Sequence, residues 1–195
     1  VVTTLLAANA VEVNQADKNG ATPLVVACVN GHAEIATKLI AANANVNQAK
    51  NEGVTPLYLA CQNGHTEVVM KLLAWNANVH QGDIKGLAPL RVACSNGHTD
   101  IVTALLAANA EVDQPVVEGW LPLHKASENG HTNVVAKLLA ANADVDAATD
   151  DGRTALYNAC CKGHAELVAE LLAANATVDQ ADEDGVTPLC SASAA

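Results

Sequence analysis

Six cysteines and seven histidines are the side chains of this chain that could bind a metal ion or act as nucleophiles. Because cysteines and histidines also have structural uses, their spacing decides between the two roles. Five histidines follow a glycine at intervals of 33 residues, namely His32, His65, His98, His131 and His164. This interval separates them too far for shared coordination at ligand distances of about 2 Å. We therefore expect them to bond adjoining loop backbone, and we predict no metal site.

Four cysteines share the same interval, and the fifth place in their register is taken by Ser127. These cysteines are Cys28, Cys61, Cys94 and Cys160. Equivalent positions in stacked helices lie about 8–10 Å apart, which exceeds the Cα separation of about 7 Å that a disulfide can bridge. We predict reduced, buried thiols and an intracellular location, cytoplasmic or nuclear. Cys161 is off register, so we expect it to be exposed, and we expect no basic residue to be placed so as to activate it.

Catalytic motifs are missing from the sequence. It contains no Gly-x-Ser-x-Gly elbow, no phosphate-binding glycine loop and no His-Glu-x-x-His pair. His124 could pair with Cys161 or Ser127 only by a coincidence of folding. We therefore predict that the chain is not an enzyme and that it uses no cofactor.

The 33-residue interval is the mark of a stacked repeat array, in which each unit contacts mainly its neighbours. In the unit over residues 50–82, Gly53 closes a turn, and Thr55 and Pro56 suit the start of a helix. Gly64 ends that short helix, and an apolar stripe then indicates a second, antiparallel helix. Asn76 follows in the place of a left-handed residue. The pattern predicts an all-α repeat solenoid, a stack of antiparallel helix pairs with projecting β-turn fingers.

We expect a single domain over residues 1–195. Its predicted parts are a partial repeat (1–16), full repeats (17–49, 50–82, 83–115, 116–148 and 149–181) and a truncated repeat (182–195). The first part aligns with a second helix and the last with a first helix that starts at Leu189, so both ends should present faces built to be covered. An extra residue over 9–13 predicts a bulge there. No run of about 18 apolar residues occurs, so we expect no membrane span.

The repeated pattern Gly-x-Thr-Pro-Leu-x-x-Ala-x-x-x-Gly-His, followed by a Leu-Leu helix and an Ala-x-Val-Asn/Asp arm, resembles the ankyrin repeat. The helix opening matches in full at 22–24, 55–57 and 187–189. It departs at one place each in three other repeats, at Ala88, Leu121 and Ala155. Ala88 and Leu121 lack a capping hydroxyl, which costs about 0.5–2 kcal/mol each. The resemblance implies a non-catalytic module that binds proteins through its fingertips and first helices, which together form a concave surface.

Two rows of variable positions indicate where a partner would bind. One row follows the turn glycine and the other follows the helix-opening leucine, and together they hold three of the four aromatic residues. Tyrosine, tryptophan and arginine are the types that most often dominate binding energy. With neighbouring positions, the predicted partner-binding residues are Tyr58, Ile84, Leu87, Arg91, Val117, Trp120, His124, Lys125, Arg153 and Tyr157. The competing interpretation, that Trp120 and the tyrosines only pack on neighbouring fingers, stays open.

The net charge of −11 is concentrated in residues 144–195, which hold ten acids and two bases. This charge repels a nucleic-acid backbone, so we expect no nucleic-acid partner. A basic patch on a protein partner would be attracted to these fingers, although solubility alone also explains them. We expect the chain to be a monomer.

Two other interpretations of the function stay open, a consensus-like or engineered scaffold without a partner, and a regulatory fragment of a longer multidomain protein. The ankyrin resemblance also implies a modification, because ankyrin arms can be substrates of an asparaginyl hydroxylase. Asn14, Asn47 and His80 occupy the matching arm position.

Overall fold

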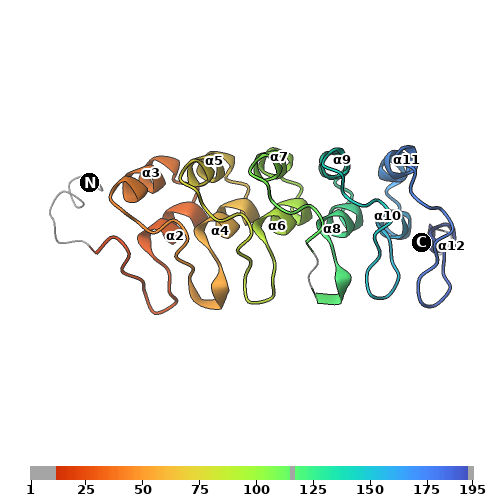
Figure 1. Cartoon of the computed structure of the whole chain (residues 1–195), viewed down its shortest axis with the longest axis horizontal. Coiled ribbons are helices and arrows are strands. Elements are labelled where there is room, and N and C mark those ends of the chain that lie inside the picture. Colours follow the sequence, from red (N-terminus) through yellow and green to blue (C-terminus); the bar gives the residue numbers. More distant parts are fainter. Residues whose placement is uncertain (1–11, 115–116, 193–195) are drawn as a thin grey trace. The chain divides into compact units, whose positions relative to one another are not determined.

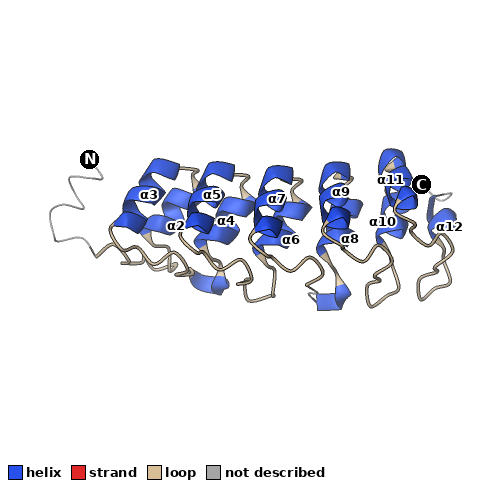
Figure 2. Ribbon diagram, turned by 45° about the horizontal axis from the view of Figure 1, so that its top comes forward, coloured by secondary structure: helices blue, strands red, loops and turns tan. Residues whose placement is uncertain are grey.

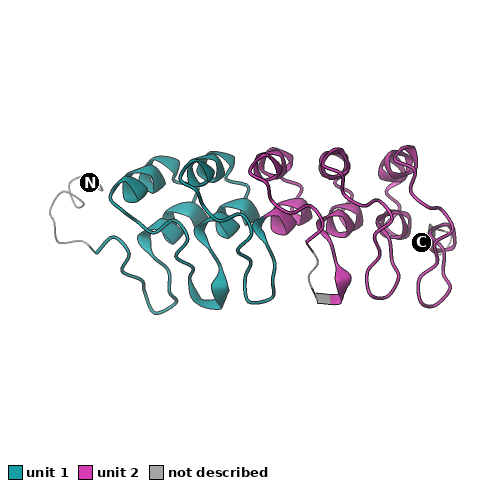
Figure 3. Ribbon diagram, in the orientation of Figure 1, with its two compact units in different colours: residues 1–89 teal, residues 90–195 magenta. Residues whose placement is uncertain are grey.

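The computed structural model describes residues 12–114 and 117–192. The chain divides into two compact units, residues 1–89 and residues 90–195, which are called unit 1 and unit 2 below (Figure 3). The partial helix predicted before residue 9, the bulge predicted over 9–13, and residues 193–195 of the predicted last helix lie wholly or mainly outside the described residues.

Among the described residues, unit 1 contains two antiparallel helix pairs. The first pair is α2 (Pro23–Val29) and α3 (Ala33–Ala41), and the second is α4 (Pro56–Gln62) and α5 (Thr66–Ala74). Within the unit, α2 packs on α4 and α3 packs on α5, so the first helices form one layer and the second helices another (Figures 1 and 2).

Unit 2 repeats this arrangement. Its first helices are α6 (Pro89–Ser95, which begins at the last residue of unit 1), α8 (Pro122–Glu128), α10 (Ala155–Cys161) and α12 (Pro188–Ala192). Its second helices are α7 (Thr99–Ala107), α9 (Thr132–Ala140) and α11 (Ala165–Ala173). The helices α8, α10 and α12 stack in order, as do α7, α9 and α11. The predicted helical repeat fold is therefore confirmed.

Small aliphatic side chains fill the core between the two layers. The leucine at the start of α2, α4, α6, α8 and α10 is almost completely buried, from Leu24 at 0% exposure to Leu156 at 2%, whereas Leu189 of the last helix, α12, is 78% exposed. The second helices contribute a matching stripe, for example Val134, Val135 and Leu138, each at 0%. Helices of seven and nine residues are too short to be stable alone in water. Burial between neighbouring pairs must therefore supply most of their stability.

Helix starts and ends follow the predicted local chemistry. The hydroxyl of Thr22 accepts a hydrogen bond from Val25 N at 3.2 Å, and Thr55 and Thr154 cap α4 and α10 in the same way. Each second helix ends at an asparagine with a positive φ angle, such as 57° at Asn76. Asparagine tolerates this left-handed conformation better than most residues, so the predicted helix stops are confirmed.

The Gly-His pairs tie neighbouring repeats together within each unit. His65 Nε2 bonds the carbonyl of Val29 at 2.9 Å, and His131 and His164 bond Ser95 and Glu128 in the same way. A Cβ atom at Gly31 would lie 2.7 Å from the His65 ring. The glycine is needed because the histidine of the next repeat packs directly against it. The predicted loop-backbone role of these histidines is confirmed at these three positions.

The fingers form a second ladder within each unit. Asn51 N donates to Asn19 O at 3.0 Å and Ile84 N to Glu52 O at 2.9 Å in unit 1. Asp150 N donates to Glu118 O, and Glu183 N donates to Asp151 O, in unit 2. Each turn is therefore held by its neighbour as well as by its own helix. The residues that project from the fingers are displayed at regular spacing inside each unit.

Candidate cation–aromatic surface

Two cation–aromatic pairs on adjacent repeats of unit 2 are the main feature of the candidate site. The ammonium of Lys125 lies 4.3 Å from the centre of the Trp120 ring, and the guanidinium carbon of Arg153 lies 5.5 Å from the centre of the Tyr157 ring. We call these four residues the cation–aromatic surface. All four are half-buried, so each presents part of its side chain to solvent. Such contacts contribute about 0.5–1 kcal/mol where they are exposed.

The position of each pair follows from the repeat. Trp120 and Arg153 directly follow the turn glycines Gly119 and Gly152, while Lys125 and Tyr157 lie in the first helices α8 and α10. The helices α8 and α10 pack side by side, and their fingers are joined by the bond from Asp150 N to Glu118 O. The packed helices and the bonded fingers therefore fix the positions of the two cation–aromatic pairs.

Carboxylates neutralise both cations of the surface. Lys125 Nζ lies 2.5 Å from Glu128 Oε2, one turn along the same helix. Arg153 Nε lies 3.1 Å from Asp151 Oδ2 and 4.0 Å from Asp182 Oδ2. None of these acids was among the predicted site residues. The spacing of Lys125 and Glu128 is the one signal in the sequence that could have indicated a pair.

Tyr157 and Asp182 share a hydrogen bond between neighbouring repeats. Partial burial raises the pKa of the Tyr157 phenol, and its bond to the Asp182 carboxylate raises that pKa further. The pKa of Asp182 is lowered, first by the N–H of Val186, which donates to it at 2.8 Å, and also by the Tyr157 hydroxyl. Tyr157 is thus a neutral donor at physiological pH, and Asp182 is an ionised acceptor.

His124 was predicted to contact a partner, and the structure shows that this is wrong. Its side chain is 0% exposed. Nδ1 accepts the backbone N–H of Leu121 at 3.1 Å, so Nε2 donates to the carbonyl of Ala147 at 2.8 Å. The ring also meets Trp120 edge-on, with the ring centres 6.0 Å apart. His124 is therefore buried beneath Trp120 and cannot contact a partner.

The prediction for Tyr58 is also corrected, because only 7% of this residue is exposed within unit 1. Its predicted neighbours in unit 1 differ from it, since Ile84 is 73% exposed and Leu87 is half-buried. In unit 2, Arg91 is half-buried, and the side chain of Val117 lies outside the described residues. The structure therefore brings together four of the predicted residues, Trp120, Lys125, Arg153 and Tyr157.

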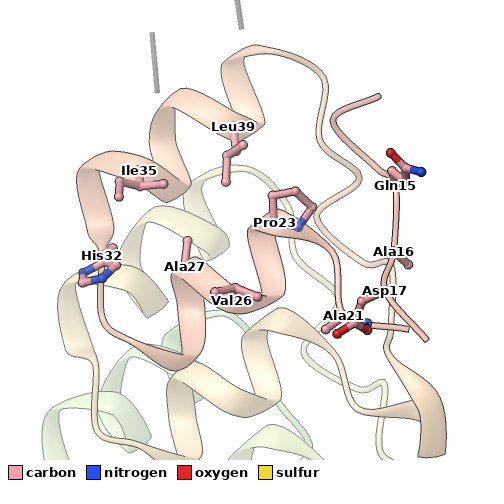
Figure 4. Close-up of a pocket in the computed structure, with 10 residues that line it drawn as sticks. All are labelled: Gln15, Ala16, Asp17, Ala21, Pro23, Val26, Ala27, His32, Ile35 and Leu39. Atoms are coloured by element: carbon pink, nitrogen blue, oxygen red, sulfur yellow. The ribbon is translucent and has the colours of Figure 1, made fainter. Parts of the chain in front are cut away.

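A groove on unit 1 is apolar, and the residues that line it include no cation–aromatic pair. It has a volume of about 560 Å³ and lies against α2 and α3, where Val26, Ile35 and Leu39 form much of its wall (Figure 4). Val26 is 51% exposed, whereas the equivalent Leu59 is 8% exposed. The groove is the stacking face of a repeat, and its apolar lining offers a ligand few polar contacts.

The cysteines differ in how far the structure exposes their thiols. Cys28, Cys61 and Cys94 are buried, and burial raises the pKa of the Cys28 thiol to about 12. Cys161 is exposed, as predicted. Among the described residues no group of three or more histidine, cysteine or acidic side chains is placed to hold a metal ion. A search of the same residues finds no helix long and apolar enough to cross a membrane.

The comparison with protein families gives the identification. The model of the ankyrin repeats matches in three copies, over residues 1–83, 70–149 and 137–195. The chain belongs to the ankyrin repeat family. A comparison with the curated proteins finds no match. Ankyrin repeats are generally protein–protein interaction modules and are typically not enzymes.

The hypothesis that the arms are hydroxylated stays a prediction. The side-chain oxygens of Asn14 and Asn47 accept hydrogen bonds from the backbone N–H groups of Asn45 and Asn78 in the next arm.

Proposed function

We propose that this ankyrin repeat protein is a non-catalytic binding module and that unit 2 contacts a protein partner through the cation–aromatic surface. The observation that supports the proposal is the pair of half-exposed aromatic rings, each with a cation beside it, on adjacent repeats. Tryptophan, tyrosine and arginine dominate binding energy when a partner excludes water from them. The cost of fixing these side chains on binding is reduced, because neighbours already hold them.

The charge around the surface favours a basic partner segment. Lys125 and Arg153 are already neutralised by acids, whereas the fingers of unit 2 carry six carboxylates on Glu118, Asp150, Asp151, Asp182, Glu183 and Asp184. Lysine or arginine side chains of a partner would meet this edge, while an apolar side chain beside them would contact Trp120. Phosphate groups would be repelled, so the proposal excludes nucleic acid as the partner.

The setting that we propose is the reducing interior of the cell, with the module acting as a monomer. All six cysteines are free thiols, and three of them are buried between helices. Unpaired cysteines in this number are typical of proteins that do not pass through an oxidising compartment.

The test is partner capture with matched variants. The Trp120→Ala/Tyr157→Ala double variant should lose most of its partner binding, with a loss of at least about tenfold in affinity. The Trp75→Ala variant removes a more exposed aromatic side chain at the end of α5 in unit 1, away from the cation–aromatic surface, so it should bind as the wild type does. Equal losses in the two variants, or unchanged binding by the double variant, would contradict the proposal.

Salt dependence tests the charge of the partner separately. Attraction between a basic segment and the acidic fingers should be screened, so the association rate should fall as ionic strength rises. The Asp150→Asn/Glu183→Gln variant should bind more slowly at low salt and show a weaker salt effect. An association rate that is independent of salt would exclude the basic partner and leave the aromatic contacts to explain binding.

A further inference from the structure

Five asparagines of the chain are followed directly by glycine, at Asn19, Asn30, Asn63, Asn96 and Asn129. An asparagine side chain can react with the backbone nitrogen of the next residue, and glycine permits this most readily because it has no Cβ to block the approach. The dipeptide is the same at all five places, and all five asparagines are exposed. Any difference in reactivity must therefore come from what the structure does with each side chain.

Four of the five side-chain amides are held by hydrogen bonds. Asn30, Asn63 and Asn96 each end a first helix and donate from Nδ2 to the carbonyl four residues earlier, at 2.8 to 2.9 Å. Asn129 donates instead to the carbonyl of Ser95 in the preceding repeat, at 2.7 Å. Rotating any of these side chains toward the glycine nitrogen breaks a well-formed hydrogen bond.

Asn19 differs because it lies in a finger of unit 1 and not at a helix end. Its backbone N–H donates to Asp17 Oδ1 at 2.8 Å, and its carbonyl accepts from Asn51 N at 3.0 Å. Within the described part of the chain, its side-chain amide makes no hydrogen bond of its own. The glycine nitrogens do not favour Asn19, since Gly20 N donates to Asp17 O at 2.9 Å whereas Gly31 N donates to Cys28 O at 3.4 Å. The side-chain amide must therefore outweigh this tighter backbone bond.

We propose that Asn19 is a site of spontaneous deamidation in the folded protein and that the four Asn-Gly pairs at the helix ends are protected. In the first step Gly20 N loses its proton and bonds to Asn19 Cγ, while the Nδ2 amide group takes up one proton and leaves as ammonia. Water then opens the resulting succinimide at either carbonyl. The products are aspartate, or isoaspartate with the main chain passing through the former side chain.

Both products change the finger that they occupy. Each adds a negative charge two residues from Asp17, whose carboxylate already holds the N–H groups of Asn19 and Ala21. Isoaspartate also lengthens the main chain by one methylene group, which displaces the carbonyl that accepts from Asn51 N. Conversion at Asn19 should therefore loosen the contact between the first two fingers of unit 1.

The experiment follows all five sites in one sample. The folded 195-residue chain is incubated at mildly alkaline pH, digested, and each Asn-Gly peptide is assayed by mass spectrometry for conversion of amide to acid. Fragmentation that separates aspartate from isoaspartate identifies both products. Asn19 should convert about five- to tenfold faster than each of the other four, the factor expected when one hydrogen bond must break before ring closure.

The same incubation in concentrated urea provides the internal control. Once the helix-end hydrogen bonds are lost, all five sites should convert at similar rates. The Asn19→Gln variant should remove the fast phase from the folded sample and leave the four slow sites unchanged. Equal rates in the folded protein, or fastest conversion at a helix-end asparagine, would overturn the proposal.

Discussion

His124 illustrates how one buried side chain can support a surface that it does not reach. The neutral ring accepts from Leu121 N and donates to Ala147 O, so adding a proton to Nδ1 must break the first bond. Burial lowers the pKa of His124 below its ordinary value of 6.5. The unfolded chain therefore binds this proton more readily than the folded one. The free energy of unfolding should consequently decrease as pH falls below about 6.5.

This pH dependence can be isolated with a variant. Urea unfolding at pH of about 7.5 and about 5.5 should show a smaller fall in stability for His124→Gln than for the wild type, because glutamine does not titrate. Trp120 lies against His124, so its fluorescence in a Trp75→Phe background should change only at lower pH, where the ring takes up a proton in the folded chain. Equal falls in stability for the two proteins would show that His124 does not couple pH to folding.

The turns offer a second prediction for single residues. Glu118 has a φ angle of 66°, which is unfavourable for a residue with a Cβ by about 1–2 kcal/mol. In the fingers that open with Asp17, Asp83 or Asp182, the carboxylate accepts turn N–H groups, and the residue before the glycine keeps a negative φ angle. Glu118→Gly should therefore raise the free energy of unfolding by up to about 1 kcal/mol.

Lys85→Gly is the matched control for this prediction, since Lys85 occupies the equivalent position in an Asp-type turn. There the glycine relieves no strain and only adds freedom to the unfolded chain, so stability should fall by about 0.5–1 kcal/mol. Both substitutions would be followed by denaturant unfolding. A loss of stability in Glu118→Gly equal to that in Lys85→Gly would show that the left-handed turn costs nothing.

At the scale of single residues, the sequence predicted scaffold roles better than surface roles. The repeated register correctly assigned His65, His131 and His164 and the asparagine helix stops, since a position shared by every repeat solves one packing problem. It misplaced His124 and Tyr58, because variation between repeats is also found at buried positions, where His124 bonds the neighbouring loop at Ala147. The acids around Arg153 come from two different fingers, and only folding brings them together.

At the scale of helices, the capping threonines give a direct comparison between repeats. Thr22, Thr55 and Thr154 each accept an N–H bond at the start of a first helix, and α6 has Ala88 at the same position. Thr22 and Thr55 are each 1% exposed, so this position accommodates a threonine without disturbing the packing. Helix boundaries were predictable from the sequence because such caps are local interactions.

The Ala88→Thr variant should consequently be more stable than the wild type, by about 1 kcal/mol. The hydroxyl would accept an N–H group at the start of α6 that alanine leaves without a side-chain partner. The comparison variant is Ala88→Val, which has the shape of threonine without the acceptor and should give no such gain. Thermal and urea unfolding would measure both, and equal stabilisation by valine would assign the effect to packing.

At the scale of the whole molecule, the charge is distributed unequally between the two units. Residues 90–195 contain 15 acids and 5 bases, whereas residues 1–89 contain 6 acids and 5 bases. The fingers of unit 2 therefore carry like charges on neighbouring repeats, as at Asp150 and Glu183, whose N–H groups each donate to the preceding finger. This repulsion lowers the stability of the compact state, and nothing in the repeat pattern itself requires these acids.

Raising the ionic strength from about 20 mM to about 500 mM should increase the melting temperature of the chain, since salt screens repulsion between exposed charges. The Asp150→Asn/Glu183→Gln variant should melt higher than the wild type at low salt and gain less from added salt. If the two proteins respond to salt equally, the finger acids do not repel each other appreciably. The same acids would attract a basic partner. An equal response to salt would therefore also predict that this attraction is weak.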